Sequence, residues 1–313
     1  MLNNALRLDP ANSSILYFGT YRMWKSTNKG NSWLAVSGDL TAGINQYFYT
    51  ITTIDVSKVN PSIVIAGTGD GRVHISVNNG QTWQNISAGL PQRWITKVAA
   101  DPFNAQTIYA TLSGFRWDEP LPHVFKSTNL GFTWTDITGN LPEFPVNDIA
   151  LDPDLPGRII VGTDAGVYGT ENSGEYWYWI WNDLPAVPVC AIKIHVPTRT
   201  IVAGTYGLSS YTASLDALVT GVSPHTRPVT MNLTTNPNPV ETSTTLKFYL
   251  PEDDKIIINA YGMNGTIVRE IFSGTLRQGR QEINFSPGDI PAGVYLVKIE
   301  GNRYSAATKI VRY

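Results

Sequence analysis

Of the 25 acidic residues in this chain of 313, five are candidates for general acid–base or nucleophilic chemistry: Asp70, Asp118, Glu119, Glu143 and Asp164. A glycosidase needs two such carboxyl groups about 5–10 Å apart across the scissile bond. No spacing among these residues singles out a pair, so the sequence assigns no catalytic residue.

Aromatic rings, arginines and carboxylates share a few segments, and this mixture suits the binding of sugars. Rings can stack on sugar faces, while arginine and carboxylate groups can hydrogen-bond hydroxyls. The longest such segment is the insertion from Ser113 to Pro120, which could also be an ordered loop that covers the edge of its sheet. The predicted ligand-binding residues are Tyr47, Asp70, Arg93, Trp94, Phe115, Arg116, Trp117, Asp118 and Glu119.

The histidines and the cysteine predict neither a metal site nor a thiol nucleophile. The four histidines lack zinc-ligand spacing, and His74 and His123 fall in or just before an expected strand. No glycine-rich phosphate loop is present, so no cofactor is expected. Cys190, the only cysteine, lies in an apolar run over residues 187–192, which predicts a buried structural thiol.

The bulk composition excludes several classes of partner. With a net charge of -2, the chain has no broad basic field for nucleic acid or anionic lipid. No apolar stretch approaches membrane-spanning length. Residues 1–4 lack the charged and apolar regions of a signal peptide. For an exported protein, this predicts that the chain is part of a longer one.

A repeat positions these residues. The octet Ser26 to Trp33 returns as Ser76 to Trp83, as Ser127 to Trp134 and, more weakly, as Thr170 to Trp177. A strand-like run that ends in a small residue and threonine precedes each octet. A leucine follows each tryptophan at one fixed distance, at Leu40, Leu90, Leu141 and Leu184. Units of roughly forty to fifty residues, each with about four short strands, are typical of β-propeller blades.

Each octet predicts a tight turn between the last two strands of its blade. The asparagine at the third position can hydrogen-bond the backbone two residues on, and the glycine supplies a positive φ. Burying the tryptophan removes about 150–250 Å² from water, or roughly 4–6 kcal/mol gross. The structural set is Ser26, Asn28, Gly30, Trp33, Ser76, Asn78, Gly80, Trp83, Ser127, Asn129, Gly131, Trp134, Asn172, Gly174 and Trp177.

The octets resemble the Asp-box, or bacterial neuraminidase repeat, with asparagine in place of the usual aspartate. The resemblance covers residues 1–211 and implies a β-propeller and not a reaction. In sialidases, xyloglucanases and sortilin-like receptors the boxes lie away from the active face. We therefore expect Tyr47, Trp94, Phe115 and Trp117 opposite the box glycines. About five blades, the fifth without an octet, are fewer than most propellers need, so further blades are expected upstream.

The periodicity stops after Tyr211. Residues 212–231 show no strand pattern and are expected to be a linker. Residues 232–313 begin with the turn Asn236 to Pro239 and continue with many short strands, which predicts a small Ig-like β-sandwich. The expected strands are Thr244 to Leu250, Lys255 to Tyr261, Thr266 to Phe272, Gln281 to Phe285, Gly293 to Glu300 and Tyr304 to Arg312.

Residues 232–313 resemble the type A sorting domain of type IX secretion substrates. The matching landmarks are Asn236 to Pro239, the turn Tyr261 to Gly265, Pro291 to Tyr295 and the closing strand Lys309 to Val311. The resemblance implies recognition by the translocon and an outer-membrane shuttle protein, and attachment to lipopolysaccharide on a Gram-negative surface. An Ig-like accessory or carbohydrate-binding module is the alternative. The sorting-signal residues are Pro237, Pro239, Gly265, Gly293, Tyr295, Lys309 and Arg312.

The leading functional interpretation is a secreted or surface-attached protein whose non-catalytic propeller binds glycan or protein. The alternative is a glycoside hydrolase of sialidase or xyloglucanase type whose catalytic residues lie partly upstream. A purely structural passenger is a third class.

Overall fold

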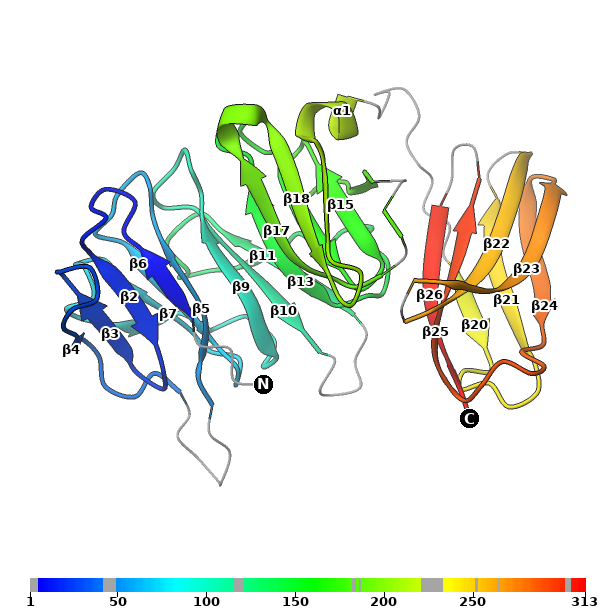
Figure 1. Ribbon diagram of the computed structural model, residues 1–313, viewed down its shortest axis with the longest axis horizontal. Coiled ribbons are helices and arrows are strands. Elements are labelled where there is room, and N and C mark those ends of the chain that lie inside the picture. The colour runs from blue at the N-terminus through cyan, green and yellow to red at the C-terminus, as the bar shows by residue number, and fades with distance from the viewer. Residues whose placement is uncertain are drawn as a thin grey trace. The chain divides into compact units, whose positions relative to one another are not determined.

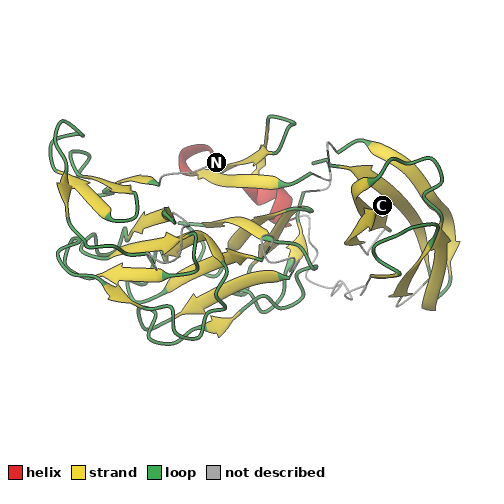
Figure 2. Cartoon of the chain, turned by 90° about the horizontal axis from the view of Figure 1, so that it is seen from below, coloured by secondary structure: helices red, strands yellow, loops and turns green. Residues whose placement is uncertain are grey.

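The computed structural model describes residues 5–41, 49–114, 121–181, 184–185, 187–220, 233–250, 253–263, 265–301 and 305–313. Strands and loops dominate this part of the chain (Figure 2). The one α-helix among the described residues, α1, spans Leu215–Thr220. The predicted all-β fold class is therefore confirmed.

The first part of the chain forms a series of antiparallel sheets, each built from strands in chain order (Figure 1). Four have four strands and the fifth has three, so they correspond to the predicted blades. Their strands are β1 (Leu6–Leu8), β2 (Leu16–Gly19), β3 (Met23–Ser26) and β4 (Leu34–Ala35); β5 (Ile51–Val56), β6 (Val64–Thr68), β7 (Val73–Ser76) and β8 (Gln84–Asn85); β9 (Trp94–Ala100), β10 (Ile108–Ser113), β11 (Pro122–Ser127) and β12 (Thr135–Asp136); β13 (Val146–Leu151), β14 (Ile159–Thr163), β15 (Gly166–Thr170) and β16 (Tyr178–Trp179); β17 (Val189–His195), β18 (Thr200–Thr205) and β19 (Ser210–Ser214).

The second strand of one blade packs against the first strand of the next. β6 and β14 are buried along their whole length, because neighbouring sheets cover both of their faces. The small residue near the end of this strand permits that approach. A Cβ atom added to Gly19 would lie 2.7 Å from Ile51 of the next blade, and one added to Gly162 would lie 2.8 Å from Val189. The glycine before the threonine is thus a packing requirement in the first and fourth blades.

Charged side chains link neighbouring first strands. Asp55 on β5 accepts a hydrogen bond from the backbone N–H of Ala100 on β9 at 2.8 Å and pairs with Arg7 on β1 at 2.6 Å. Asp55 therefore connects three consecutive blades. Lys97 on β9 reaches Asp148 on β13 at 3.3 Å. These contacts stabilise the stacking of sheets that cannot bury both faces alone.

The chain falls into two compact units. The first comprises Met1–Gly139, Pro145–Val161 and Thr170–Tyr176, and the second comprises Asn140–Phe144, Gly162–Gly169 and Trp177–Tyr313. The second unit contains two further antiparallel sheets, ordered β20-β21-β24 and β23-β22-β25-β26. Their strands are β20 (Thr234–Asn236), β21 (Thr244–Leu250), β22 (Asp254–Gly262), β23 (Ile267–Leu276), β24 (Gly279–Phe285), β25 (Gly293–Glu300) and β26 (Ser305–Arg312).

The two C-terminal sheets enclose one hydrophobic core, as a sandwich requires. Leu246 and Phe248 of β21 face Ile256 and Ile258 of β22 across it, and Val297 of β25 completes the cluster. Six of the strands were predicted within a few residues. The sequence did not predict β20, a short strand beside the proline-rich turn.

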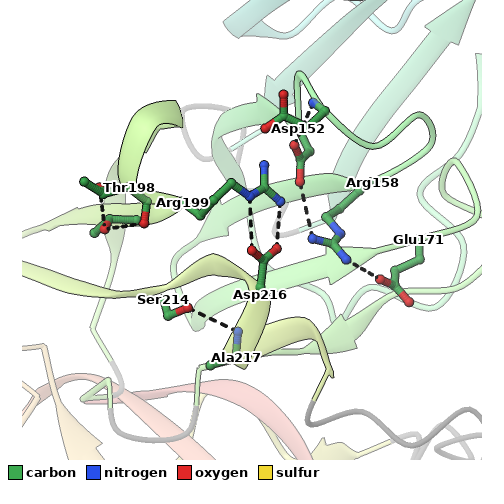
Figure 3. A network of polar contacts seen from close by, with 10 residues as sticks. Asp152, Arg158, Glu171, Thr198, Arg199, Ser214, Asp216 and Ala217 are labelled. Carbon is green, nitrogen blue, oxygen red and sulfur yellow. Dashed lines mark hydrogen bonds and ion pairs between the residues drawn. The ribbon is translucent and has the colours of Figure 1, made fainter.

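The segment expected to be a linker begins with regular structure. β19 continues to Ser214 and α1 follows it directly. Arg199 anchors the helix, since its guanidinium donates to both carboxylate oxygens of Asp216 at 2.7 and 3.1 Å (Figure 3). A second ion-pair group in the same figure links Arg158 to Asp152 and Glu171, at 3.3 and 2.8 Å.

The prediction that Cys190 is buried was wrong. Cys190 is exposed. The register of β17 against β18 shifts between Val189 and Ala191, so a bulge at this cysteine interrupts the alternation of side chains. An apolar run in the sequence cannot reveal such a bulge. Burial of part of the side chain, together with the nearby Asp164, raises the pKa of the thiol.

Candidate functional site

The box turns and the turns between the first two strands of each blade lie at one end of the sheets. Backbone N–H groups within the octets donate to that neighbouring turn, as from Lys29 to Ser14 and from Asn79 to Ser62, each at 2.9 Å. Antiparallel order then puts the turn between the second and third strands, and the entry from the preceding blade, at the opposite end. Trp94, the first residue of β9, lies at that opposite end from Gly131 of its own blade, as predicted.

A threonine organises this turn in the second, fourth and fifth blades. The Thr68 hydroxyl accepts from the Arg72 N–H at 2.9 Å, and the Thr163 hydroxyl donates to the Gly166 carbonyl at 3.0 Å. Thr205 bonds the Ser209 carbonyl at 2.8 Å. In these three blades the threonine at the end of the second strand is therefore the residue that closes the turn. Gly69 to Gly71 forms such a turn, as the sequence predicted.

Three of the predicted ligand-binding residues come together at the second and third blades. A Cβ atom added to Gly69 would lie 3.7 Å from the Trp94 ring, and one added to Gly71 would lie 2.9 Å from the backbone of Arg93. Asp70, between these glycines, is 5% exposed. Its carboxylate accepts from Thr68 at 2.5 Å and lies 3.6 Å from Arg72.

The Asp70 carboxylate is already engaged within the turn by its contacts with Thr68 and Arg72. Trp94 and Arg93 are half-buried, and the Arg93 guanidinium donates to the Gln92 carbonyl at 3.0 Å. The arrangement can position a hydroxylated ring against Trp94. The ligand role of these residues stays a prediction. The other members of the set, Tyr47, Phe115, Arg116, Trp117, Asp118 and Glu119, lie outside the described residues.

One aromatic position at the same end of the sheets was missed by sequence reasoning. Tyr21, directly after the threonine of the first blade, is 44% exposed, and the Arg22 guanidinium lies 4.6 Å from its ring centroid. An aromatic residue directly after the recurring threonine is the sequence signal that could have identified Tyr21.

Titratable groups in the described ranges do not assemble into a metal site. No group of three or more histidine, cysteine, aspartate or glutamate side chains in that part of the chain could hold a metal ion. His74 lies on β7 and His123 on β11, as predicted, and both are buried. Burial lowers the pKa of His74, opposed by its hydrogen bond to the Leu40 backbone.

The octets build one repeated hydrogen-bond pattern. In the second blade the Gly80 N–H donates to Ser76 Oγ at 2.8 Å, and the Thr82 N–H donates to Asn78 Oδ1 at 2.9 Å. Asn78 thus bonds the backbone four residues on, and the prediction of two residues was wrong. The reason is that two consecutive residues, Asn79 and Gly80, both have positive φ, which lengthens the turn.

The octet also clamps the preceding blade. The indole of Trp83 donates to the Val36 carbonyl at 3.0 Å, and that of Trp134 donates to Ile86 at 2.7 Å. A Cβ atom on Gly174 would lie 2.9 Å from Ile137 of the preceding blade. Glycine is therefore required at position 174 by the approach of the preceding blade as well as by its positive φ.

The landmarks of the C-terminal domain have defined structural roles. The Asn238 amide donates to the Lys309 carbonyl at 2.8 Å and accepts from the Val311 N–H at 2.9 Å, so it straps the outer edge of β26. The Tyr295 hydroxyl donates to the Pro291 carbonyl at 2.7 Å and closes the turn before β25. Of the remaining sorting-signal residues, Pro237 and Pro239 flank Asn238, Gly265 has a positive φ, Gly293 begins β25 and Arg312 ends β26.

The propeller blades are followed by a two-sheet domain, and this domain identifies the chain as an exported protein. Residues 235–312 match the family of the secretion system C-terminal sorting domain. The chain is thus cargo of the type IX secretion system and reaches the outer surface of the cell or the medium. No described helix is long and apolar enough to cross a membrane.

The propeller region is similar to xyloglucanases. It is 28% identical over 216 residues to a xyloglucanase of Hypocrea jecorina (strain QM6a), an alignment that covers 58% of this chain and 26% of the relative. The crystal structure of a GH74 enzyme from Niastella koreensis matches 99% of this chain and 57% of its own, at 18% identity and a TM-score of 0.53. A GH74 xyloglucanase from Xanthomonas campestris matches 80% of this chain and 43% of its own, at 12% identity and a TM-score of 0.53. The chain therefore carries a GH74 xyloglucanase-like propeller region that spans about a quarter of the curated relative's length.

Proposed function

We propose that this protein is a surface-attached glycan-binding protein whose propeller holds a branched β-glucan of the xyloglucan type. The supporting observation is the group formed by Trp94, Arg93 and the Thr68 to Arg72 turn, at the end of the sheets opposite the octets. An indole beside hydrogen-bonding groups is suited to a pyranose ring. The xyloglucanase relative supplies the class of glycan.

The proposal assigns separate tasks to the parts of the chain. Residues 1–211 bind the ligand, and residues 212–231 connect the propeller to the C-terminal domain. Residues 232–313 direct the protein to the translocon and the outer-membrane shuttle protein. Attachment to lipopolysaccharide then fixes the propeller at the cell surface. The Asp70 carboxylate, engaged with Thr68, favours binding over catalysis.

Calorimetric titration with xyloglucan oligosaccharides tests the proposal. We expect Trp94→Ala to weaken binding at least tenfold. Trp33→Ala is the matched control, because Trp33 is an exposed indole at the opposite end of a sheet. Equal binding by wild type and Trp94→Ala would reject this site, and no binding of any β-glucan would reject the function.

A glycoside hydrolase is the second candidate, and the alignment with a xyloglucanase is what favours it. An assay of reducing ends released from xyloglucan separates the two functions. Release that is lost in a carboxylate variant such as Asp164→Asn would establish the hydrolase. Binding without release supports the non-catalytic protein.

A further inference from the structure

Part of the outward face of the larger C-terminal sheet, on β22 and β25, is covered, although that domain already has its own core. On β25, Tyr295, Val297 and Ile299 point into the core between the two sheets. Leu296 and Lys298 alternate with them and therefore point the other way. Both are nevertheless buried. A sandwich that stood alone would expose this face to water.

The covering residues come from the fourth blade and lie in the same compact unit. Leu296 and Tyr261 form an apolar cluster with Phe144 and Ala165. Phe144 precedes β13, and Ala165 lies in the turn between β14 and β15. The blade therefore presents apolar side chains to β22 and β25.

The turn at Gly265 contacts the same side of the propeller. A Cβ atom added there would lie 3.1 Å from Leu208, which precedes β19, and 3.4 Å from Pro185. Gly265 is one of the sorting-signal landmarks. Its lack of a side chain thus serves close packing as well as its positive φ.

Lys298 is the charged member of the contact. Its ammonium nitrogen lies 3.4 Å from the ring centroid of Trp179 on β16 and 2.7 Å from a carboxylate oxygen of Glu300. The side chain is 5% exposed. Such a desolvated cation is stable only while a carboxylate and an aromatic face surround it.

We propose that this face is a latch that holds the sorting domain on the fourth blade of its own passenger. While the latch is closed, Tyr261, Leu296 and Lys298 are unavailable to other proteins. A partner that binds the closed form must use other surfaces of the domain, such as the β20-β21-β24 sheet, the exposed strand β23 or the strapped edge of β26. A partner that needs the covered face must first displace Trp179 from Lys298.

Amine acetylation of the intact chain, followed by peptide mass spectrometry, tests the latch. Lys247 is an internal standard, because it also pairs with a carboxylate, Glu282, at 3.0 Å, but its side chain is 49% exposed. We expect Lys298 to react at least tenfold more slowly than Lys247. Reaction of the two lysines within twofold of each other would overturn the proposal.

Variants then separate the latch from the pairing with Glu300. Trp179→Ser is expected to raise the acetylation rate of Lys298 several-fold and to leave Lys247 unchanged, whereas the control Trp33→Ser changes neither. Ala165→Glu, which places a carboxylate in the apolar cluster, should act like Trp179→Ser and serves if that variant does not fold. An unchanged Lys298 rate in a folded variant of either kind would contradict the latch.

Discussion

Trp134 donates its indole N–H to the carbonyl oxygen of Ile86 at 2.7 Å, across 48 residues of sequence and from one blade to the one before it. The first octet differs, since Trp33 donates within its own turn, to Gly30 at 3.0 Å, and is 38% exposed. Equivalent positions in the repeat thus have different burial and different partners.

Trp134→Ala should destabilise the protein by about 3–5 kcal/mol, because it removes a packed ring and the bond to Ile86. The same loss is expected for Trp83→Ala. The control Trp33→Ala should cost clearly less. Urea denaturation followed by circular dichroism measures all three. Equal losses at Trp33 and Trp134 would show that the inter-blade contact contributes nothing.

Asn238→Ala should destabilise the C-terminal domain by about 1–3 kcal/mol, because the Lys309 carbonyl and the Val311 N–H both lose their partner. Hydrogen exchange at Val311 should accelerate in parallel. Thr234→Ala is the matched control, since its hydroxyl makes a single long bond of 3.5 Å. Unchanged exchange at Val311 would argue against the strap.

Stability should fall at mildly acidic pH because of His74. Burial lowers the pKa of His74 in the folded state, and the charge of Arg72 lowers it further. The hydrogen bond to the Leu40 backbone and the charge of Asp70 act in the opposite direction. The unfolded chain takes up a proton near pH 6.5 and the folded chain does not. The contribution of neutral His74 to the free energy of unfolding is therefore present above about pH 6.5. It is lost as the pH falls from there toward the lowered pKa of the folded state.

Urea midpoints at pH 7.5 and 5.5 test this pH dependence. The wild type should lose more stability between the two than His74→Gln does. The exposed His195 provides the control variant, His195→Gln. An identical pH response in wild type and His74→Gln would exclude His74 as the cause.

Deleting residues 233–313 should leave a folded propeller that stays within the cell envelope. Fusing the same segment to a foreign periplasmic protein should carry that protein to the surface. The physical basis is the independent core between the two C-terminal sheets. Surface labelling of intact cells measures both outcomes. Normal display of the truncated form would refute the assignment of residues 233–313 as an export signal.

The sequence predicted those elements that repeat or alternate. The octets, the strands that end in threonine and most C-terminal strands follow from local patterns of glycine, tryptophan and alternation. The position of Trp94 opposite Gly131 followed from the same strand assignment.

Features that depend on neighbouring sheets could not be predicted in this way. The bulge that exposes Cys190 changes one register, and no residue type requires it. The engagement of Asp70 by Thr68 depends on the shape of a turn. The burial of Lys298 depends on Trp179, which is remote in sequence. A pattern within one segment carries no information about such partners.

The inter-blade clamp couples the folding of neighbouring blades. Gly80, Gly131 and Trp134 contact the residues that directly follow the last strand of the preceding blade, Val36 and Ile86. A contact stabilises both of its partners, so each clamp stabilises two blades at once. In a linear array with nearest-neighbour coupling, structure that forms in one blade therefore favours the folding of the next, whichever blade folds first.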